Sequence, residues 1–228
     1  MARFAAIFDL DGTLLDTLGD LTNAVNAALS ALSLPLRTRD EVRSFIGNGV
    51  PTLVRRALPE GKGSLHGSAL ELFTAYYMAH IADSTRPFDG IPALLGALKN
   101  EGAAVAVVSN KKDEATRALC DRFFGPLIDY AAGARNDTER KPAPDMLLRA
   151  LGALGSDRDS AVYIGDSDTD IAAARAAGLR IECVGWGYRT RDFLLSAGAR
   201  SVAETPEELF DAVTRALFAG KNPKEQNT

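Results

Sequence analysis

Short apolar runs, each followed by a turn and then a helical pattern, constrain the fold of this chain more than any other feature. The runs lie at 5–8, 104–108, 161–164 and 180–185, with a weaker candidate at 129–133. Runs this short and this apolar are typical of parallel strands that are buried on both faces. The helical segments 92–102 and 170–178 each close on a glycine, which is common at helix C-termini. Alternating strands and helices predict a doubly wound α/β fold with a parallel sheet.

One interval is too long for this alternation. Roughly 85 residues separate Asp16 from the next strand, whereas a strand–helix–strand unit takes only ~30 or more. The additional residues carry four helical patterns, at 17–34, 39–47, 50–58 and 68–82. The first of these segments has an apolar stripe at helical spacing. We therefore predict a Rossmann-like core domain built from residues 1–15 and 86–228, with a helical cap domain inserted at 16–85. The polar segment 219–228 is expected to fray.

Polar side chains stand where three of the predicted strands end. Asp9 and Asp11 follow the first run, Ser109 follows the second, and Asp166 follows the third. Ligands of open parallel sheets bind at the carboxyl ends of the strands, so we expect these side chains to converge at one edge. Two carboxylates as close as Asp9 and Asp11 repel each other and are costly to bury, but a cation would offset the repulsion. The four acids Asp9, Asp11, Asp166 and Asp170 form an oxygen-rich cluster that suits Mg²⁺.

Composition excludes several other classes of protein. The 228 residues are 46% hydrophobic and 25% charged, which is ordinary for a globular protein with a sizeable core. The net charge of −4 and the lack of a basic run argue against a nucleic-acid partner. No apolar run approaches the ~20 residues of a membrane span, and two distant cysteines favour a reduced, cytoplasmic protein. The sequence has only two histidines, which argues against a zinc site and against a Ser-His-Asp triad.

The residues at these strand ends resemble a known family. The segment DLDGT, residues 9–13, looks like motif I of the haloacid dehalogenase (HAD) superfamily. Ser109 fits motif II, Lys141 in RKPAPD fits motif III, and DSDTD at 166–170 fits motif IV, while the inserted helices fit the alpha-helical C1 cap. In finer detail the chain is similar to the phosphoglycolate phosphatase group, on the segments IGNGVPTLVRRAL at 46–58 and VGWGY at 184–188.

The resemblance implies a phosphatase that hydrolyses a small phosphate monoester through an aspartyl-phosphate. Asp9 would be the nucleophile, and Asp11 would give a proton to the leaving oxygen and later take one from water. Ser109 would donate a hydrogen bond to a phosphate oxygen, and Lys141 would supply positive charge. Gly12 lets the chain turn away so that the phosphate can approach. Further substrate contacts are expected from two neighbours of these motifs, Thr13 and Asn110.

The same resemblance implies the ligands of the metal. Mg²⁺ would be held by Asp9, Asp166 and the main-chain carbonyl of Asp11, with Asp170 in support. The spacing of the acids alone does not determine this ligand set.

The cap is expected to select the substrate, because the core handles only the phosphoryl group. Gly47-Asn48-Gly49 precedes a helix, and a helix N-terminus behind glycines is a potential anion site. Arg55 or Arg56, one turn later, would add positive charge. A small phosphorylated acid such as 2-phosphoglycolate is therefore our preferred substrate.

Other functions stay open at this point. Nucleoside monophosphates or pyrophosphate are alternative substrates, and a beta-phosphoglucomutase-like phosphomutase is an alternative activity of the same superfamily. A phospho-accepting signalling domain also places acids, a hydroxyl and a lysine on a doubly wound sheet, but it is typically smaller and has no helical insertion. The expected partner is a small phosphorylated metabolite, with neither nucleic acid nor membrane, and the chain is expected to be a monomer or homodimer.

Overall fold

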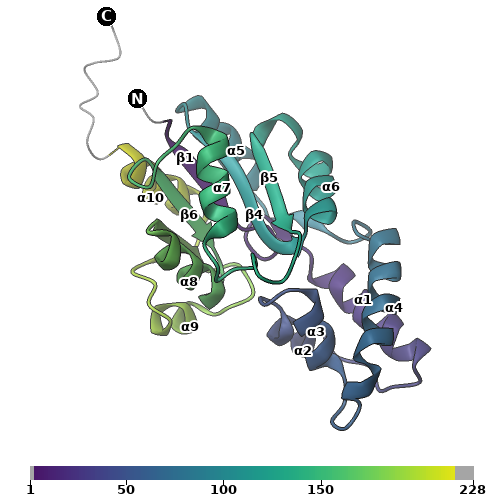
Figure 1. Ribbon diagram of the computed structural model, residues 1–228. Coiled ribbons are helices and arrows are strands. Elements are labelled where there is room, and N and C mark those ends of the chain that lie inside the picture. The colour runs from purple at the N-terminus through teal and green to yellow at the C-terminus, as the bar shows by residue number, and fades with distance from the viewer. Residues whose placement is uncertain (1–2, 219–228) are drawn as a thin grey trace, which may run out of the picture.

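The computed structural model describes residues 3–218 and has a parallel six-stranded sheet at its centre (Figure 1). The strand order is β5-β4-β1-β6-β7-β8, so β1 lies in the middle. The strand bounds are β1 Ala5–Phe8, β4 Ala104–Lys112, β5 Tyr130–Ala134, β6 Ala161–Gly165, β7 Arg180–Val184 and β8 Val202–Ala203. All five predicted strands are present, and the doubly wound α/β prediction is confirmed. The short edge strand β8 was not predicted.

Helices cover both faces of this sheet because successive side chains of a strand point to opposite sides. Ala6 and Phe8 of β1 pack in one cluster of buried residues, and Ala5 and Ile7 pack in another. The first cluster is completed by α5 Ile91–Asn100, α6 Asp113–Phe123 and α10 Pro206–Phe218. The second is completed by α7 Asp145–Leu154 and α8 Asp168–Ala177, while α9 Arg191–Ser196 packs at the β8 edge.

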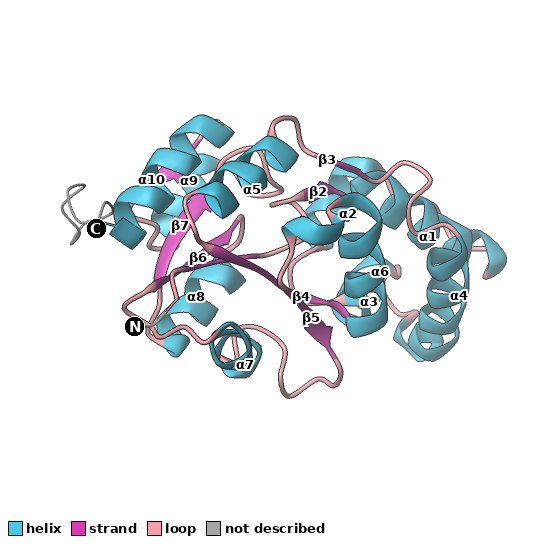
Figure 2. Ribbon diagram, turned by 90° about the horizontal axis from the view of Figure 1, so that it is seen from above, coloured by secondary structure: helices cyan, strands magenta, loops and turns pink. Residues whose placement is uncertain are grey.

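The four helices between β1 and α5 form a group of their own, to one side of the sheet (Figures 1 and 2). They share a separate cluster of buried residues, to which the core contributes Tyr188. Their bounds are α1 Leu18–Ala31, α2 Arg39–Phe45, α3 Val50–Ala57 and α4 His66–Ala79, with a 3-10 turn at Gly63–Leu65. These four helices are called the cap below. The exact division of the chain into two domains stays a prediction.

The two connections between cap and core lie side by side. β2 Leu15–Asp16 and β3 Arg86–Pro87 form a small antiparallel pair, which sequence patterns did not predict. Asp20 of α1, only 2% exposed, fixes the return connection by accepting hydrogen bonds from the main-chain N–H and hydroxyl groups of Ser84 and Thr85. These bonds hold the pKa of Asp20 below its ordinary value although burial acts to raise it.

Element boundaries differ from the predictions by a few residues. Helix α1 ends at Ala31 rather than residue 34, because Ser33 adopts a positive φ of 54° that a helix cannot continue. Strand β4 runs on through Ser109 to Lys112. Cys120 and Cys183 are free and buried, and none of the helices within residues 3–218 is long and apolar enough to cross a membrane. The segment 219–228 lies outside the described residues.

Candidate active site

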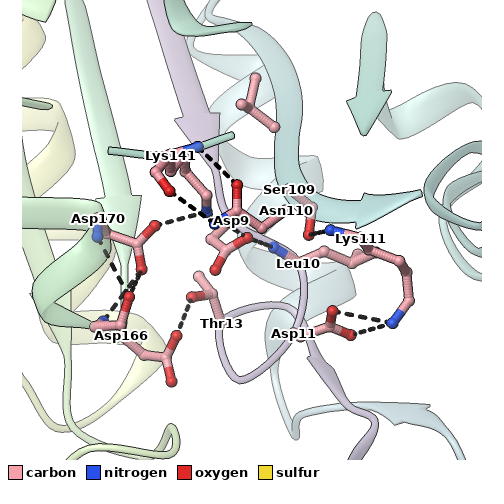
Figure 3. Close-up of polar contacts among 12 residues, drawn as sticks. Asp9, Leu10, Asp11, Thr13, Ser109, Asn110, Lys111, Lys141, Asp166 and Asp170 are labelled. Carbon is pink, nitrogen blue, oxygen red and sulfur yellow. Dashed lines mark hydrogen bonds and ion pairs between the residues drawn. The ribbon is translucent and has the colours of Figure 1, made fainter. Parts of the chain in front are cut away.

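The register of the three central strands sets their carboxyl ends level. Phe8 of β1 pairs with Val107 of β4 on one side and with Ile164 of β6 on the other. Asp9 follows β1 directly, Ser109 lies two residues beyond Val107 within β4, and Asp166 follows the last residue of β6. Side chains that are 57 to 157 residues apart in sequence therefore meet at one edge (Figure 3).

The Lys141 ammonium connects the carboxylates at this edge. Its Nζ lies 2.8 Å from Asp9 Oδ1 and 2.7 Å from Asp170 Oδ1, and the lysine side chain is 2% exposed. The loop that carries it is held by Asn110, whose side chain accepts from the Lys141 N–H at 2.7 Å and donates to the Lys141 carbonyl at 3.0 Å. Asn110, predicted to contact substrate, thus positions the lysine.

Asp9 presents one free oxygen to this site. Its Oδ1 accepts from the Leu10 N–H at 2.7 Å as well as from Lys141. Its Oδ2 accepts no hydrogen bond from any residue that the structure describes. A carboxylate held by one oxygen, with the other unengaged, is oriented for nucleophilic attack.

Asp170 is more fully engaged than Asp9. It is fully buried, and its Oδ1 accepts from Lys141 and from the Tyr163 hydroxyl, both at 2.7 Å. Its Oδ2 accepts from the Ser167 N–H and hydroxyl at 3.1 and 2.5 Å, in the capping box that begins α8. Because both oxygens are already bonded, Asp170 holds Lys141 and the start of α8 in place.

Burial and mutual repulsion perturb the acids of the cluster. The pKa of Asp9 rises to about 7, because burial and the neighbouring charge of Asp170 outweigh the effect of Lys141. The pKa of Asp166 rises to about 8, again through burial and through the charges of Asp170 and Asp9. The Lys141 pKa is raised above its ordinary value, although burial opposes this, by Asp170 and Asp9. The site therefore holds more negative charge than its own residues neutralise.

The donor set fits a divalent cation that prefers oxygen. Asp9, Asp166 and Asp170 each offer a carboxylate oxygen, and these atoms lie within 4.8 Å of one another. Three carboxylates against one ammonium leave an excess of two negative charges, which a hard divalent ion would balance. Asp166 is oriented by the Tyr188 N–H at 2.7 Å and the Thr13 hydroxyl at 3.3 Å.

Asp11 lies on the other side of Asp9 and is tied to different partners. Both of its oxygens bind the Lys111 ammonium, at 2.9 and 3.0 Å. Its Oδ1 also accepts from the Thr17 hydroxyl at 2.7 Å. Tyr188, which belongs to the core, bonds the same threonine through its hydroxyl at 3.0 Å. Asp11 is thereby linked to the first connection between core and cap.

The cap segment 46–50 lies over the strand ends and lines the site. With the strand ends it encloses a cavity with an empty volume of ≈ 590 Å³, part of it open to solvent. Gly47 and Gly49 line this cavity together with Ser109, and the Gly47 carbonyl accepts from the Asn110 side chain at 3.2 Å. The guanidinium of Arg189 donates to the Ile46 carbonyl at 2.7 Å. Cap and core therefore meet directly over the acids.

A family model described as haloacid dehalogenase-like hydrolase matches residues 6–184, which include every strand end of this site. This chain belongs to that family. The HAD assignment made from the sequence motifs is therefore confirmed.

Individual relatives in the HAD family match nearly the whole chain. A phosphoglycolate phosphatase of Aquifex aeolicus is 35% identical over 83% of this chain and 91% of its own length. An N-acetylmuramic acid 6-phosphate phosphatase of Pseudomonas aeruginosa is 34% identical over 93% of this chain and 96% of its own. Among solved structures, one from Lactobacillus delbrueckii subsp. bulgaricus, assigned to the phosphoglycolate phosphatases, is 37% identical with a TM-score of 0.89, covering 93% of this chain and 99% of its own.

Three residues predicted to bind substrate lie away from the cavity. Arg55 is exposed on α3, whose buried face is formed by other positions, and is not among the residues that line the cavity. Asn48 bonds Thr169 and Arg56 instead. Thr13 is fully buried behind Asp166. The structure brings the other predicted residues to the cavity or to its supporting network.

Sequence reasoning missed three HAD-site residues, namely Lys111, Tyr188 and Arg189. The predicted strand ended at residue 108, so Lys111 fell outside it and looked no different from the exposed Lys112. Alternation along a longer strand would have placed Lys111 on the same side as Ser109. Tyr188 and Arg189 follow a glycine-rich turn, which carries no periodic signal that could place them.

Proposed function

We propose that this protein is a Mg²⁺-dependent phosphatase that hydrolyses a small phosphate monoester through an aspartyl-phosphate on Asp9. The enzyme class, a phosphoric monoester hydrolase, follows from the family and from the relatives. The mechanism rests on one observation above all: Asp9 is held through Oδ1 by Lys141 and the Leu10 N–H, while Oδ2 stays free. A signalling domain would not need the cavity beneath a helical cap at which Asp9 lies.

In the first step, Asp9 Oδ2 attacks phosphorus, and the bond from phosphorus to the ester oxygen breaks. Asp11 gives its proton to that oxygen, and the alcohol leaves. In the second step, water attacks phosphorus of the aspartyl-phosphate while Asp11 takes its proton. The bond between phosphorus and Asp9 then breaks and inorganic phosphate is released. Asp11 must turn from its ion pair with Lys111 toward the ester oxygen and take up a proton from solvent before the first transfer, and the proton that it takes from water in the second step restores this state.

Two groups stabilise the charge that develops on the phosphoryl oxygens. Ser109 lines the cavity and supplies a hydroxyl donor. The Lys141 ammonium, oriented by Asp170 and Tyr163, supplies a fixed positive charge that needs no rearrangement during the reaction. Removing one such donor typically costs ~10²–10³-fold in rate.

Mg²⁺ would be held by Asp9 and Asp166, with the main-chain carbonyl of Asp11 as a further ligand. When bound, it would neutralise charge on the transferring phosphoryl group and lower the repulsion among the carboxylates. Asp170 acts in this proposal as a positioning residue, because its two oxygens are already bonded.

The proposed substrate is a small phosphorylated metabolite, and phosphoglycolate is the first candidate. The phosphoglycolate phosphatases among the relatives support it. N-acetylmuramic acid 6-phosphate is the second candidate, supported by the relative from Pseudomonas aeruginosa. A cytoplasmic location is part of the proposal, supported by the two free, buried cysteines.

The test is a panel of phosphate esters with purified enzyme, with and without metal. We expect phosphate release to require Mg²⁺, to stop with EDTA and to resume when Mg²⁺ is restored. Calcium should inhibit, because its looser coordination geometry does not suit an in-line displacement. Full activity in metal-free buffer would refute the metal requirement. A dependence on a catalytic sugar bisphosphate would show a phosphomutase instead of a phosphatase.

A further inference from the structure

The Lys111 ammonium is a buried cation at the cavity whose one carboxylate partner, among the described residues, is Asp11. Its side chain is 2% exposed, and Nζ binds both Asp11 oxygens at 2.9 and 3.0 Å (Figure 3). Nζ also lies 4.9 Å from the centre of the Tyr77 ring of α4. Lys111 thus stands where the core strand β4, the proposed proton donor and the cap meet.

The other cations that line the cavity are engaged elsewhere. Lys141 is shared between Asp9 and Asp170. Arg189 donates to main-chain carbonyls of the cap, and its nearest carboxylate, on Asp168, lies 3.9 Å away. Arg55 and Arg56, which the sequence had suggested as anion-binding residues, are exposed on α3 and do not line the cavity. Lys111 is therefore the lining cation that contacts Asp11, the proposed proton donor to the leaving group.

The proposed mechanism removes Asp11 from Lys111. To donate to the ester oxygen, Asp11 must carry a proton and direct that carboxyl oxygen at the substrate, so it no longer supplies a negative charge to the Lys111 ammonium that both of its oxygens now contact. A buried ammonium that loses its only anion is strongly disfavoured. A second anionic group on the leaving part of the substrate would replace the lost partner and so favour the rearrangement.

Bond lengths restrict where that anionic group can be. The ester oxygen must come within ~2.6–3.2 Å of Asp11, which places it about 6 Å or less from Lys111 Nζ as the structure stands. A carboxylate joined to the ester oxygen through one methylene has its oxygens roughly 3 Å from the ester oxygen, given carbon bonds of about 1.5 Å. The remaining ~3 Å is the length of a charged hydrogen bond.

We propose that Lys111 determines specificity by binding a carboxylate one carbon from the ester oxygen, in exchange for Asp11. This inference rests on the proposed phosphatase function and narrows its substrate class to short phosphorylated 2-hydroxy acids. The cap contributes the apolar side chains of Leu21 and Leu53 to the same cavity.

The experiment compares two substrates of nearly equal shape, 2-phosphoglycolate and its neutral amide. We expect wild-type enzyme to prefer the acid in kcat/KM, and Lys111→Met to reduce that preference by ~10- to 100-fold, the range for a hydrogen bond to a charged group. Lys112→Met removes the same charge from the neighbouring, exposed residue and should leave the preference unchanged. Lys111→Arg, which keeps the positive charge, should retain most of the preference for the acid.

The outcomes separate this inference from the proposed function. If wild-type enzyme hydrolyses neither substrate nor any other phosphate ester, both fail. If it hydrolyses esters without preferring the acid, or if Lys111→Met keeps the wild-type preference, the role of Lys111 is refuted and the phosphatase stands. If Lys111→Met does not fold, the wild-type enzyme still shows whether the acid is preferred over the amide. Lys111→Gln then provides a second neutral variant for the role of Lys111. A drop in rate that is equal for both substrates would show that Lys111 only positions Asp11.

Discussion

Replacing Lys141 by methionine tests whether one buried ammonium holds the carboxylate cluster together. Methionine has similar length and is apolar, so packing changes should cost less than ~1.5 kcal/mol. The charge is the larger effect, since Asp9 and Asp170 lose their cation at 2.8 and 2.7 Å. Removing one partner of a buried ion pair costs about 3–5 kcal/mol. We expect a loss of that size in the free energy of unfolding at pH 8 without metal.

The loss should depend on pH in a defined direction. The pKa of Asp9 in the folded protein is about 7 and that of Asp166 about 8, both above the ordinary 3.8. These two acids ionise more easily in the unfolded chain than in the folded protein. The free energy of unfolding therefore falls as the pH rises from ~4 toward their folded-state pKa values. Lys141 keeps its own charge throughout this window, since its pKa is raised from 10.5.

Without the ammonium, the pKa of Asp9 should rise further. The gap in stability between wild type and variant should therefore widen from pH 5 to pH 8 by at most about 1.4 kcal/mol, because the wild-type Asp9, with a pKa of about 7, ionises only over the last unit of this range. At pH 5 the loss of the contact with Asp170 should remain.

Urea denaturation in EDTA at pH 5 and pH 8 measures this directly. Lys112→Met is the matched control, because Lys112 is exposed, and its stability should match wild type at both values. A Lys141→Met loss that is equal at the two pH values, or that is absent at pH 8, would refute the electrostatic reasoning. Phosphatase activity of the variant should be lost at both.

The remaining predictions concern the acids and one glycine. Asp9→Asn should abolish turnover, whereas Asp11→Asn should lose ~10²–10⁴-fold and accumulate a phosphate adduct on Asp9, seen by rapid quench and mass spectrometry; an adduct on another residue would contradict the assigned nucleophile. Asp20→Asn should lower the unfolding free energy by about 1.5–3 kcal/mol at pH 7. The difference from wild type should shrink below pH ~4, because the Asp20 carboxylate, whose pKa is lowered by folding, stabilises the folded protein only while it is ionised. Gly12→Ala should impair Mg²⁺ affinity in calorimetry, since φ is +85° and an added Cβ would overlap the Asp166 carboxylate; unchanged affinity would show that this turn tolerates a side chain.

The sequence by itself determined the core of this protein and the order of its chemistry. Apolar runs too short for helices require buried parallel strands, and parallel strands end at a common edge. The residues that follow those runs, Asp9, Ser109 and Asp166, were therefore expected to meet, and the register of β1 with its two neighbours places them at one edge. The family was evident for the same reason, because its motifs are local segments of a few residues.

Only the tertiary structure decided which charges face one another. Lys111 and Lys112 are equivalent in the sequence, yet one is buried against Asp11 and the other is exposed. Arg55 carries the charge that an anion site would need, but the face of α3 on which it lies turns it away from the cavity. Contacts between cap and core join segments about 60 to 150 residues apart, and such pairings depend on how the two parts pack, which no local pattern encodes.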